Sequence, residues 1–225
     1  VDTKLESTLN YAFDNQYGYL TACPTNLGTG MRASAMLHLP GLVLSEQINK
    51  VINAVNKIGL AVRGLYGEGT EALGNLFQVS NQHTLGEQEN EIIARLEKVI
   101  RQIIEHEENA REKLYNEKQT ILDDKIGRSY AILRYGHIIS TKEALDLLSM
   151  LRVGVDLSYF PEDIRALIDV LFMEIQPAHL QVFADRKLGA EERDSLRAEI
   201  MRDRLKSLPE PSKFSGNKSN EQSSE

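Results

Sequence analysis

The first part of the chain combines short strand-like segments with one helical pattern. Apolar and polar residues alternate through 33–39, and the apolar runs at 60–63 and 76–80 have the length of strands. Before the second run, apolar residues recur every three or four positions, which predicts a helix that begins at an N-cap, Ser45, and ends before Gly59. This order predicts antiparallel strands with helices laid on one face.

The first residues are less regular. Leu5, Leu9 and Phe13 have the spacing of one face of a short helix that ends near Gly18, and residues 19–22 resemble a short strand. The chain begins with Val1 rather than methionine, so we expect that it has been cut or processed.

Longer helical patterns follow. Residues 87–118 carry one apolar stripe opposite a face rich in Glu, Lys and Arg, which predicts a long helix, with a coiled coil as an alternative. Further on, a capping box at Ser140, prolines 161 and 177, and the pattern from Glu191 to Lys206 predict a series of helices. We therefore predict three parts: a strand-containing part at 1–118, a helical domain at 119–207 and a disordered tail at 208–225.

Composition narrows the classes of function. The net charge of −7 argues against a general nucleic-acid binder, and a single cysteine excludes an internal disulfide. The five histidines have no metal-ligand spacing, so we predict no metal site formed by the protein alone. No apolar run has the length of a membrane span and no signal peptide is visible, which favours no membrane partner and a cytoplasmic location.

The candidate chemistry begins at residues 23–36, Cys-Pro-Thr-Asn-Leu-Gly-Thr-Gly-Met-Arg-Ala-Ser-Ala-Met. Gly28 and Gly30 allow a tight turn and a close approach to a ligand, and Arg32 follows at the start of the first strand. A thiol, a glycine turn and an arginine together suit an anion site beside a reactive group. The alternative is that Cys23 is a small buried apolar residue.

Three motifs carry a resemblance to a known family. Residues 23–33 and the segment Arg63-Gly64-Leu65-Tyr66-Gly67-Glu68-Gly69-Thr70-Glu71 resemble the two signatures of the guanidino phosphotransferases, the creatine and arginine kinase family. Arg193-Asp194-Ser195-Leu196-Arg197-Ala198 resembles a motif of the bacterial protein-arginine kinases in that family. The resemblance runs from about residue 10 to about residue 207. It implies an α+β fold, in which an antiparallel sheet flanked by helices is followed by an all-helical C-terminal domain.

The resemblance implies an ATP site in the first part. Arg32 and Arg63 would contact the phosphates, because a guanidinium binds phosphate oxygens in a fixed fork. The alternative is that both are surface ion-pair partners. Creatine and arginine kinases have a histidine where this chain has Met36, so contacts to adenine would differ. The complete set of implied ATP-binding residues is Arg32, Ala33, Ser34, Ala35, Met36, Arg63, Gly64, Leu65, Tyr66, Gly67 and Glu68.

Two residues are implied to be catalytic. By resemblance, Cys23 lies beside the acceptor guanidinium, where a thiolate would favour and orient the cationic substrate. The hydroxyl of Thr25, two residues on, is placed to lower the thiol pKa by a hydrogen bond. Glu68 stands in a glycine-rich loop that would close over the substrates and would pair with a guanidinium. The alternative for Glu68 is an ordinary exposed carboxylate.

The helical domain is implied to hold a regulatory phosphoarginine pocket. Arg193 and Arg197 are one helical turn apart, so two guanidinium groups could hold the phosphate while Asp194 pairs with the guanidinium part of the ligand. The pocket would comprise Arg193, Asp194, Ser195, Leu196, Arg197 and Ala198. The alternative is a salt-bridge network within one helix.

The resulting hypothesis is a protein-arginine kinase that lacks its N-terminal part and uses ATP with Mg²⁺ carried by the nucleotide. The resemblance implies protein substrates with exposed arginines, degradation of marked proteins by the Clp protease, control of a stress-gene repressor, a zinc-binding activator and a homodimer. One alternative is an incomplete fragment that acts as a phosphoarginine-binding regulatory module. Another is a kinase for small guanidines, which the helical extension disfavours.

Overall fold

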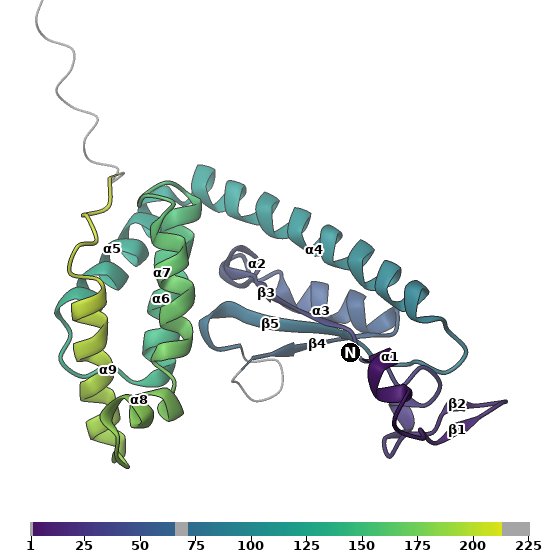
Figure 1. The fold of residues 1–225 in the computed structure, drawn as a ribbon. Coiled ribbons are helices and arrows are strands. Elements are labelled where there is room, and N and C mark those ends of the chain that lie inside the picture. Colours follow the sequence, from purple (N-terminus) through teal and green to yellow (C-terminus); the bar gives the residue numbers. More distant parts are fainter. Residues whose placement is uncertain (1, 66–71, 213–225) are drawn as a thin grey trace, which may run out of the picture. The chain divides into compact units, whose positions relative to one another are not determined.

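The computed structural model describes residues 2–65 and 72–212, and these form two compact units (Figure 1). The first unit comprises residues 1–72 and 76–108, and the second comprises 73–75 and 109–225. The predicted mixture of strands and helices, followed by helices alone, is confirmed, and the fold class is α+β.

A three-stranded antiparallel sheet organises the first unit. Its strands are β3 (Ser34–His38), β4 (Leu60–Gly64) and β5 (Leu76–Asn81), in the order β3-β5-β4. Each strand matches one of the three strand-like segments in the sequence. Because β5 is central, every residue of β5 has a neighbour on at least one side, and its alternation decides which side chains face the core.

Helices cover one face of this sheet. In Figure 1, α2 (Pro40–Leu44), α3 (Ile48–Lys57) and α4 (Glu89–Glu117) lie on the same side of the strands. The side chains between them are almost wholly buried, and this burial is the main stabilising term of the unit. They are Ile52, Val55, Leu60, Val62, Phe77, Val79, Ile92, Leu96, Val99 and Ile103.

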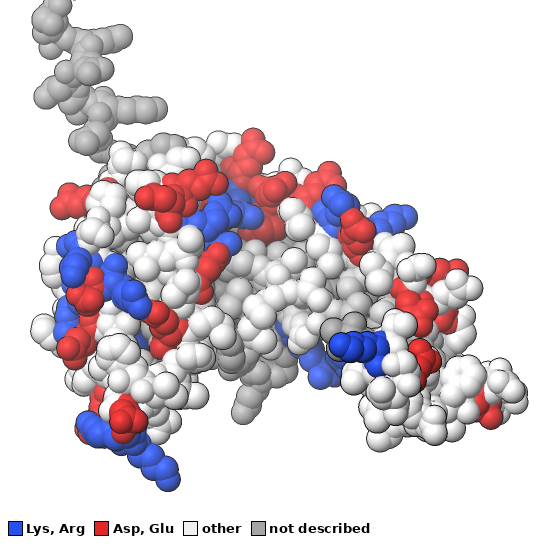
Figure 2. All heavy atoms as spheres, in the orientation of Figure 1, with Lys and Arg blue, Asp and Glu red and all other residues white. Residues whose placement is uncertain are grey.

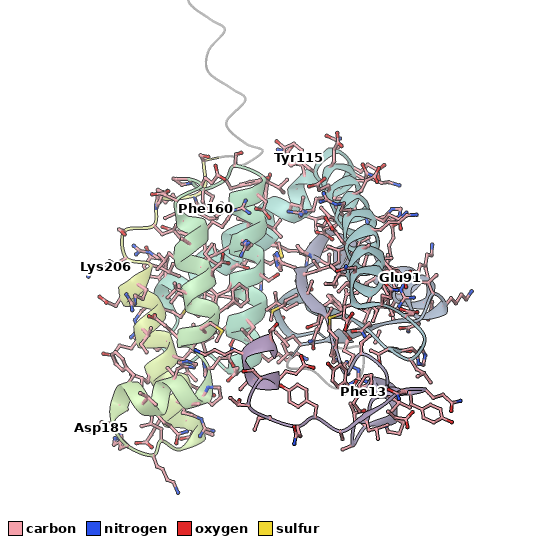
Figure 3. The ribbon with its side chains drawn as sticks, turned by 45° about the vertical axis from the view of Figure 1, so that its right-hand side comes forward. Phe13, Glu91, Tyr115, Phe160, Asp185 and Lys206 are labelled. Carbon is pink, nitrogen blue, oxygen red and sulfur yellow. The ribbon has the colours of Figure 1, made fainter. Side chains whose placement is uncertain are left out.

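Two local predictions in this unit are wrong. The helix expected to run to Gly18 is only α1 (Asp2–Glu6), and a hairpin of β1 (Phe13–Asp14) and β2 (Gly18–Tyr19) follows it. The Asp14 carboxylate accepts hydrogen bonds from two backbone N–H groups of the turn, which favours the hairpin over a helix. Phe13, labelled in Figure 3, packs its ring against Tyr19 with centroids 5.3 Å apart.

Ser45 does not cap α3. It is the C-cap of α2, a short helix that the sequence analysis missed, and Gln47 is the N-cap of α3. The N-terminus of α2 is held by the buried carboxylate of Glu107, which accepts from Gly41 N at 2.7 Å and from Leu42 N at 2.9 Å. Because Glu107 is far from α2 in the sequence, this cap leaves no signature in the residues around α2. The end of α3 is as predicted: Gly59 follows the helix with φ 77°.

The second unit is helical. It contains α5 (Gln119–Tyr135), α6 (Thr141–Asp156), α7 (Ile164–Glu174), α8 (Pro177–Ala184) and α9 (Ala190–Arg204). Ser140 caps α6 through Glu143 N, as predicted, and Pro177 begins α8. The core is formed by apolar side chains from all five helices: Leu122, Ile126, Leu133, Leu145, Leu148, Leu151, Ile168, Leu171, Leu180 and Met201.

A short segment from the sheet region belongs to this second unit. The 3₁₀ turn η2 (Leu73–Asn75) packs on α6, where Gly74 N donates to Asp146 at 2.9 Å and Asn75 donates to Ser149 at 2.7 Å.

The division predicted after residue 118 stays a prediction. Of the predicted tail, Leu208 is buried and Ser212 N donates to Tyr159 O, and residues 213–225 lie outside the described part.

Within the described residues, no helix is long and apolar enough to cross a membrane. The same part of the chain contains no group of three or more His, Cys, Asp or Glu side chains with metal-binding geometry.

Candidate functional site

The sheet of the first unit has one face covered by helices and one open face. Strand alternation places Ser34 and Met36 of β3 on the open face, and their partners on β5, Ser80 and Gln78, share it because paired residues point the same way. Arg63 of β4 lies opposite Gln78 and therefore also points there. The open face thus carries exposed side chains on its two edge strands, and between them the half-buried Gln78 and the buried Ser80 of β5.

Two arginines flank the central strand on this face. Arg32 lies two residues before the start of β3 and is exposed, and its Nη2 donates to the Ser80 hydroxyl at 3.0 Å. Arg63 is exposed on the opposite edge strand, with β5 between the two. Two guanidinium groups on one face, separated by a single strand, can bind different oxygens of one polyphosphate.

The other predicted ATP-binding residues have different environments. Ser34 and Met36 are exposed on the open face, whereas Ala33, Ala35, Gly64 and Leu65 are half-buried. Alternation is the reason, because only every second residue of β3 can face a ligand on this side. Tyr66, Gly67 and Glu68 lie outside the described residues, so the predicted loop carboxylate has no position here.

The loop before Arg32 is fixed to the end of β5. Asn81 accepts from Ala33 N at 2.8 Å and donates to Met31 O at 3.1 Å, and Thr84 donates to Leu27 O at 2.7 Å. Gly28 has φ 109°, and a Cβ there would stand 2.7 Å from Thr84 O. The close approach at Gly28 is therefore to the chain itself, and it sets the position from which Arg32 emerges.

Cys23 is exposed at the start of this loop, so the alternative of a buried structural cysteine is wrong. Its Sγ lies 3.0 Å from Oγ1 of Thr25, the partner predicted from the sequence. Hydrogen bonds from the Thr25 side chain and backbone lower the pKa of the Cys23 thiol, and the positive charge of Arg32 adds to the effect. These contacts favour the thiolate form of Cys23 more than in an isolated thiol, and they place the sulfur within the field of a phosphate-binding candidate.

The sequence analysis missed three residues of β5. Gln78 donates to Ser34 at 3.0 Å, Ser80 accepts from Arg32, and Asn81 holds the loop. The signal was present, because Gln78 and Ser80 are the polar members of an alternating strand. Assigning them to the site required the pairing register, which a single sequence does not reveal.

The second predicted site lies on α9. Arg193 is half-buried and donates to Leu188 O at 3.0 Å. Arg197 is wholly buried, and its guanidinium donates to four acceptors. These are Ile175 O at 3.0 Å, Ile139 O at 2.8 Å, Asp194 Oδ1 at 2.5 Å and Thr141 Oγ1 at 2.8 Å. Asp194 thus pairs with Arg197 along the helix, the arrangement of the salt-bridge alternative, and the phosphoarginine pocket stays a prediction.

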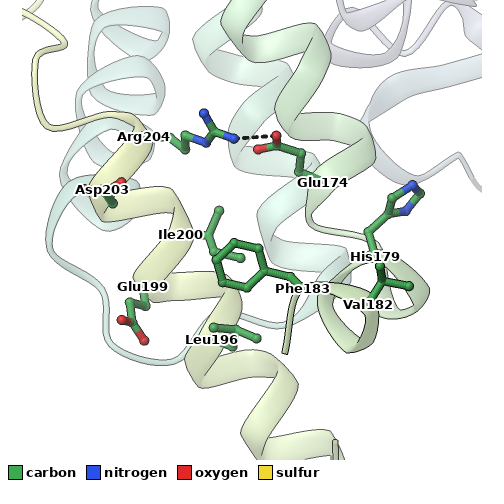
Figure 4. A pocket seen from close by; sticks show the side chains of 9 residues that line it. All are labelled: Glu174, His179, Val182, Phe183, Leu196, Glu199, Ile200, Asp203 and Arg204. Carbon is green, nitrogen blue, oxygen red and sulfur yellow. Dashed lines mark hydrogen bonds and ion pairs between the residues drawn. The ribbon is translucent and has the colours of Figure 1, made fainter. Parts of the chain in front are cut away.

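An apolar groove lies beside this motif in the second unit (Figure 4). Its volume is about 450 Å³, and Phe183 of α8 faces Leu196 and Ile200 of α9 across it. Its rim carries the ion pair between Arg204 and Glu174, at 2.6 Å. Val182 and Phe183 are 80% and 72% exposed, which is high for large apolar side chains.

Charges elsewhere are mixed. Figure 2 shows Lys and Arg interspersed with Asp and Glu along α4, in agreement with its i,i+4 pair Arg101–Glu97. The visible face therefore has no continuous basic surface of the kind that nucleic-acid binding requires.

Comparison with known proteins extends these observations. The family described as ATP:guanido phosphotransferase, C-terminal catalytic domain, matches residues 1–110, and the family described as protein-arginine kinase McsB C-terminal domain matches residues 119–216. A solved structure of lombricine kinase matches 48% of this chain and 29% of its own chain, with 31% identity and a TM-score of 0.40.

Curated relatives match most of the chain. The protein-arginine kinases of Bacillus mycoides (strain KBAB4) and Bacillus cereus (strain AH187) are each 50% identical to it over 206 residues. These matches cover 92% of this chain and 58% of each relative, so the chain spans little more than half of their length. With both domain families present in the same order, the chain belongs to the ATP:guanido phosphotransferase family, in its protein-arginine kinase branch.

Proposed function

We propose that this chain forms the nucleotide-binding part of a protein-arginine kinase, which transfers the γ-phosphoryl group of ATP to arginine side chains of proteins. The observation that carries the proposal is the open sheet face, where Arg32 and Arg63 flank β5 and Cys23 lies in the field of Arg32. The curated relatives bear the name protein-arginine kinase.

In this proposal the side chains divide the work. Arg32 and Arg63 bind phosphate oxygens and balance their charge, which is the main requirement for phosphoryl transfer. Ser80 holds the Arg32 guanidinium in place. The Cys23 thiolate attracts and orients the acceptor guanidinium, and Glu68, outside the described residues, pairs with it. The P–O bond to ADP breaks as a guanidinium nitrogen gains the phosphoryl group and loses a proton.

Magnesium would arrive with the nucleotide. The described residues contain no carboxylate group of the kind that would hold the ion without a nucleotide. No step is therefore assigned to Mg²⁺ held by the described residues alone.

We also propose a regulatory phosphoarginine pocket on α9. Arg197 connects α9 to Ile139 between α5 and α6, to Thr141 at the start of α6 and to Ile175 at the end of α7. A phosphate that draws Arg197 away from one of these acceptors would loosen the ends of neighbouring helices. Binding of phosphoarginine at Arg193 and Asp194 would thus be coupled to the packing of the whole helical unit.

The partners are proposed on the same footing. We propose a homodimer supported by the exposed apolar groove in Figure 4, because an apolar surface of this kind is suited to contact with a second chain. Further proposals are a cytoplasmic location, a zinc-binding activator, a stress-gene repressor as substrate, and delivery of marked proteins to the Clp protease. These rest on membership in the protein-arginine kinase branch.

The decisive experiment is phosphotransfer by this chain. Labelled ATP, magnesium and an unfolded arginine-rich protein are incubated with it, and acid-labile phosphate on arginine is measured. A full-length relative serves as positive control. Labelled arginine that disappears with Arg32→Ala would support the proposal. A folded chain that binds no nucleotide, beside an active control, would contradict it, and label on free arginine alone would favour a small-guanidine kinase.

A further inference from the structure

A second groove lies in the first unit, between α3 and α4 and on the helical side of the sheet. Its volume is about 420 Å³. Its apolar lining comes from Leu42 of α2, from α3 with its C-cap Ile58, and from α4; the α3 and α4 residues are Val51, Ala54, Val55, Val99 and Ile103. The open sheet face lies on the other side of the strands, so this groove takes no part in the proposed nucleotide site (Figure 1).

Both walls of the groove present the same periodicity. On the side of α3 and its two caps the lining residues fall at positions 47, 50, 51, 54, 55 and 58, and those of α4 fall at 99, 102, 103 and 106. Each set is a continuous stripe with helical spacing, so two helices face one elongated space. Such a space accepts a third helix, whose apolar residues at i, i+3 or i+4, and i+7 enter between the two walls.

The apolar lining has a buried floor, formed by Val55, Val99 and Ile103, and an exposed edge on the α3 side. Ile58 is 49% exposed at one end of the α3 stripe, and Ala54 is exposed at its centre. The stripe from Gln47 to Ile58 extends about 16 Å at 1.5 Å per residue. A partner helix of about three turns would cover it.

The rim of the groove selects the charge of the partner. Lys50 and His106 are the ionisable side chains among the described lining residues, and Gln47 and Gln102 complete the polar rim. The sequence contains no Asp or Glu between residues 47 and 67, although the chain as a whole has a net charge of −7. A groove whose described lining carries Lys50 and no carboxylate favours a partner with negative charge.

We propose that this groove docks an amphipathic helix of a partner protein, with apolar anchors at helical spacing and Asp or Glu on both flanks. The anchors would contact Val51, Ala54 and Ile58, and the carboxylates would face Lys50 and His106. This inference is independent of the proposed phosphotransfer.

The test uses two labelled helical peptides that share leucine anchors, one flanked by glutamate and the other by lysine. Fluorescence anisotropy measures their binding to the whole chain. Ala54→Glu places a carboxylate in the centre of the groove on an exposed, helix-compatible position. Asn56→Glu adds the same charge to the same helix but outside the lining and serves as the matched control.

We expect the glutamate peptide to bind at least about tenfold more tightly than the lysine peptide, a difference of about 1.4 kcal/mol. Ala54→Glu should weaken it by a similar factor, whereas Asn56→Glu should leave binding within about twofold. Nucleotide binding should be unchanged in both variants. Equal binding of the two peptides, no binding of either, or equal effects of the two substitutions would overturn the proposal. Self-association abolished by Ala54→Glu would also overturn it, because the occupant would then be a second copy.

Discussion

Arginine performs opposite tasks in the two units. On the open sheet face, Arg32 and Arg63 are exposed, and Arg32 donates to one hydroxyl. On α9, Arg197 is wholly buried and donates to four acceptors from three parts of the helical unit. The same side chain is available for a ligand in one place and committed to the fold in the other.

The difference follows from secondary structure. A strand alternates its side chains between two faces, so an arginine on the open face can remain exposed while its neighbours fill the core. A helix that packs on several others surrounds one stripe of its residues, and a polar group in that stripe must find its partners within the protein. Motif spacing alone does not distinguish the two situations.

Removal of Arg197 should give the largest change in stability. Arg197→Ala leaves two backbone carbonyls, Thr141 and Asp194 without their buried donor, and we expect the free energy of unfolding to fall by about 3–5 kcal/mol. Urea denaturation followed by circular dichroism measures this. Arg204→Ala, on the same helix but with its own side chain 48% exposed, should cost at most about 1 kcal/mol. If the two variants lost the same free energy of unfolding, Arg197 would not be committed to the fold more than an exposed arginine.

Removal of Arg32 should change binding rather than stability. Because the side chain is exposed, Arg32→Ala should alter the free energy of unfolding by no more than about 0.5 kcal/mol. Loss of its charged hydrogen bonds to phosphate should weaken ATP binding by about 1.5–3 kcal/mol, measured by titration calorimetry. Lys57→Ala, an exposed cation on α3, is the control and should bind ATP normally. A destabilised Arg32 variant with unchanged affinity would give Arg32 a structural role instead.

A smaller effect should come from the support of Arg32. Ser80→Ala removes the hydroxyl that accepts from Arg32 Nη2, and ATP affinity should fall by about 0.5–1.5 kcal/mol, the net value of one hydrogen bond. Ser80→Thr keeps the hydroxyl and should restore most of the affinity. If both variants bind ATP like the unaltered chain, the Ser80 contact does not position Arg32 for the nucleotide.

The accuracy of the sequence predictions follows the range of the interactions involved. Strands β3–β5 and helix α4 were predicted because their apolar pattern is local. Helix α2 was missed because its N-terminus is capped by Glu107, which is distant in sequence, and the helix expected to run to Gly18 was wrong because the Asp14 turn favours a hairpin. In each case a partner or turn outweighed apolar spacing.

The candidate sites divide in the same way. The Cys23–Thr25 pair was predicted correctly because two residues in one turn are bound to be neighbours. Gln78 and Ser80 were missed because their proximity to Arg32 depends on sheet register. The commitment of Arg197 to Ile139 and Ile175 was equally hidden, since those acceptors are backbone groups that carry no residue signal.

The smallest change concerns the thiol. Thr25 lowers the pKa of Cys23, chiefly through its side chain and next through its backbone. Thr25→Val removes the hydroxyl but keeps the backbone N–H, so the pKa should rise part of the way towards its ordinary value. A higher pKa leaves less thiolate at neutral pH, and alkylation by iodoacetamide should therefore slow there, while the rates converge at high pH where both thiols are ionised. Thr25→Ser keeps the hydroxyl and should react like the unaltered chain.

If Thr25→Val does not change how the alkylation rate depends on pH, the backbone N–H and the charge of Arg32 are sufficient to hold the thiol pKa down. The sulfur would then depend on the same exposed arginine as the proposed nucleotide, and Arg32→Ala should shift the profile upward where Thr25→Val did not.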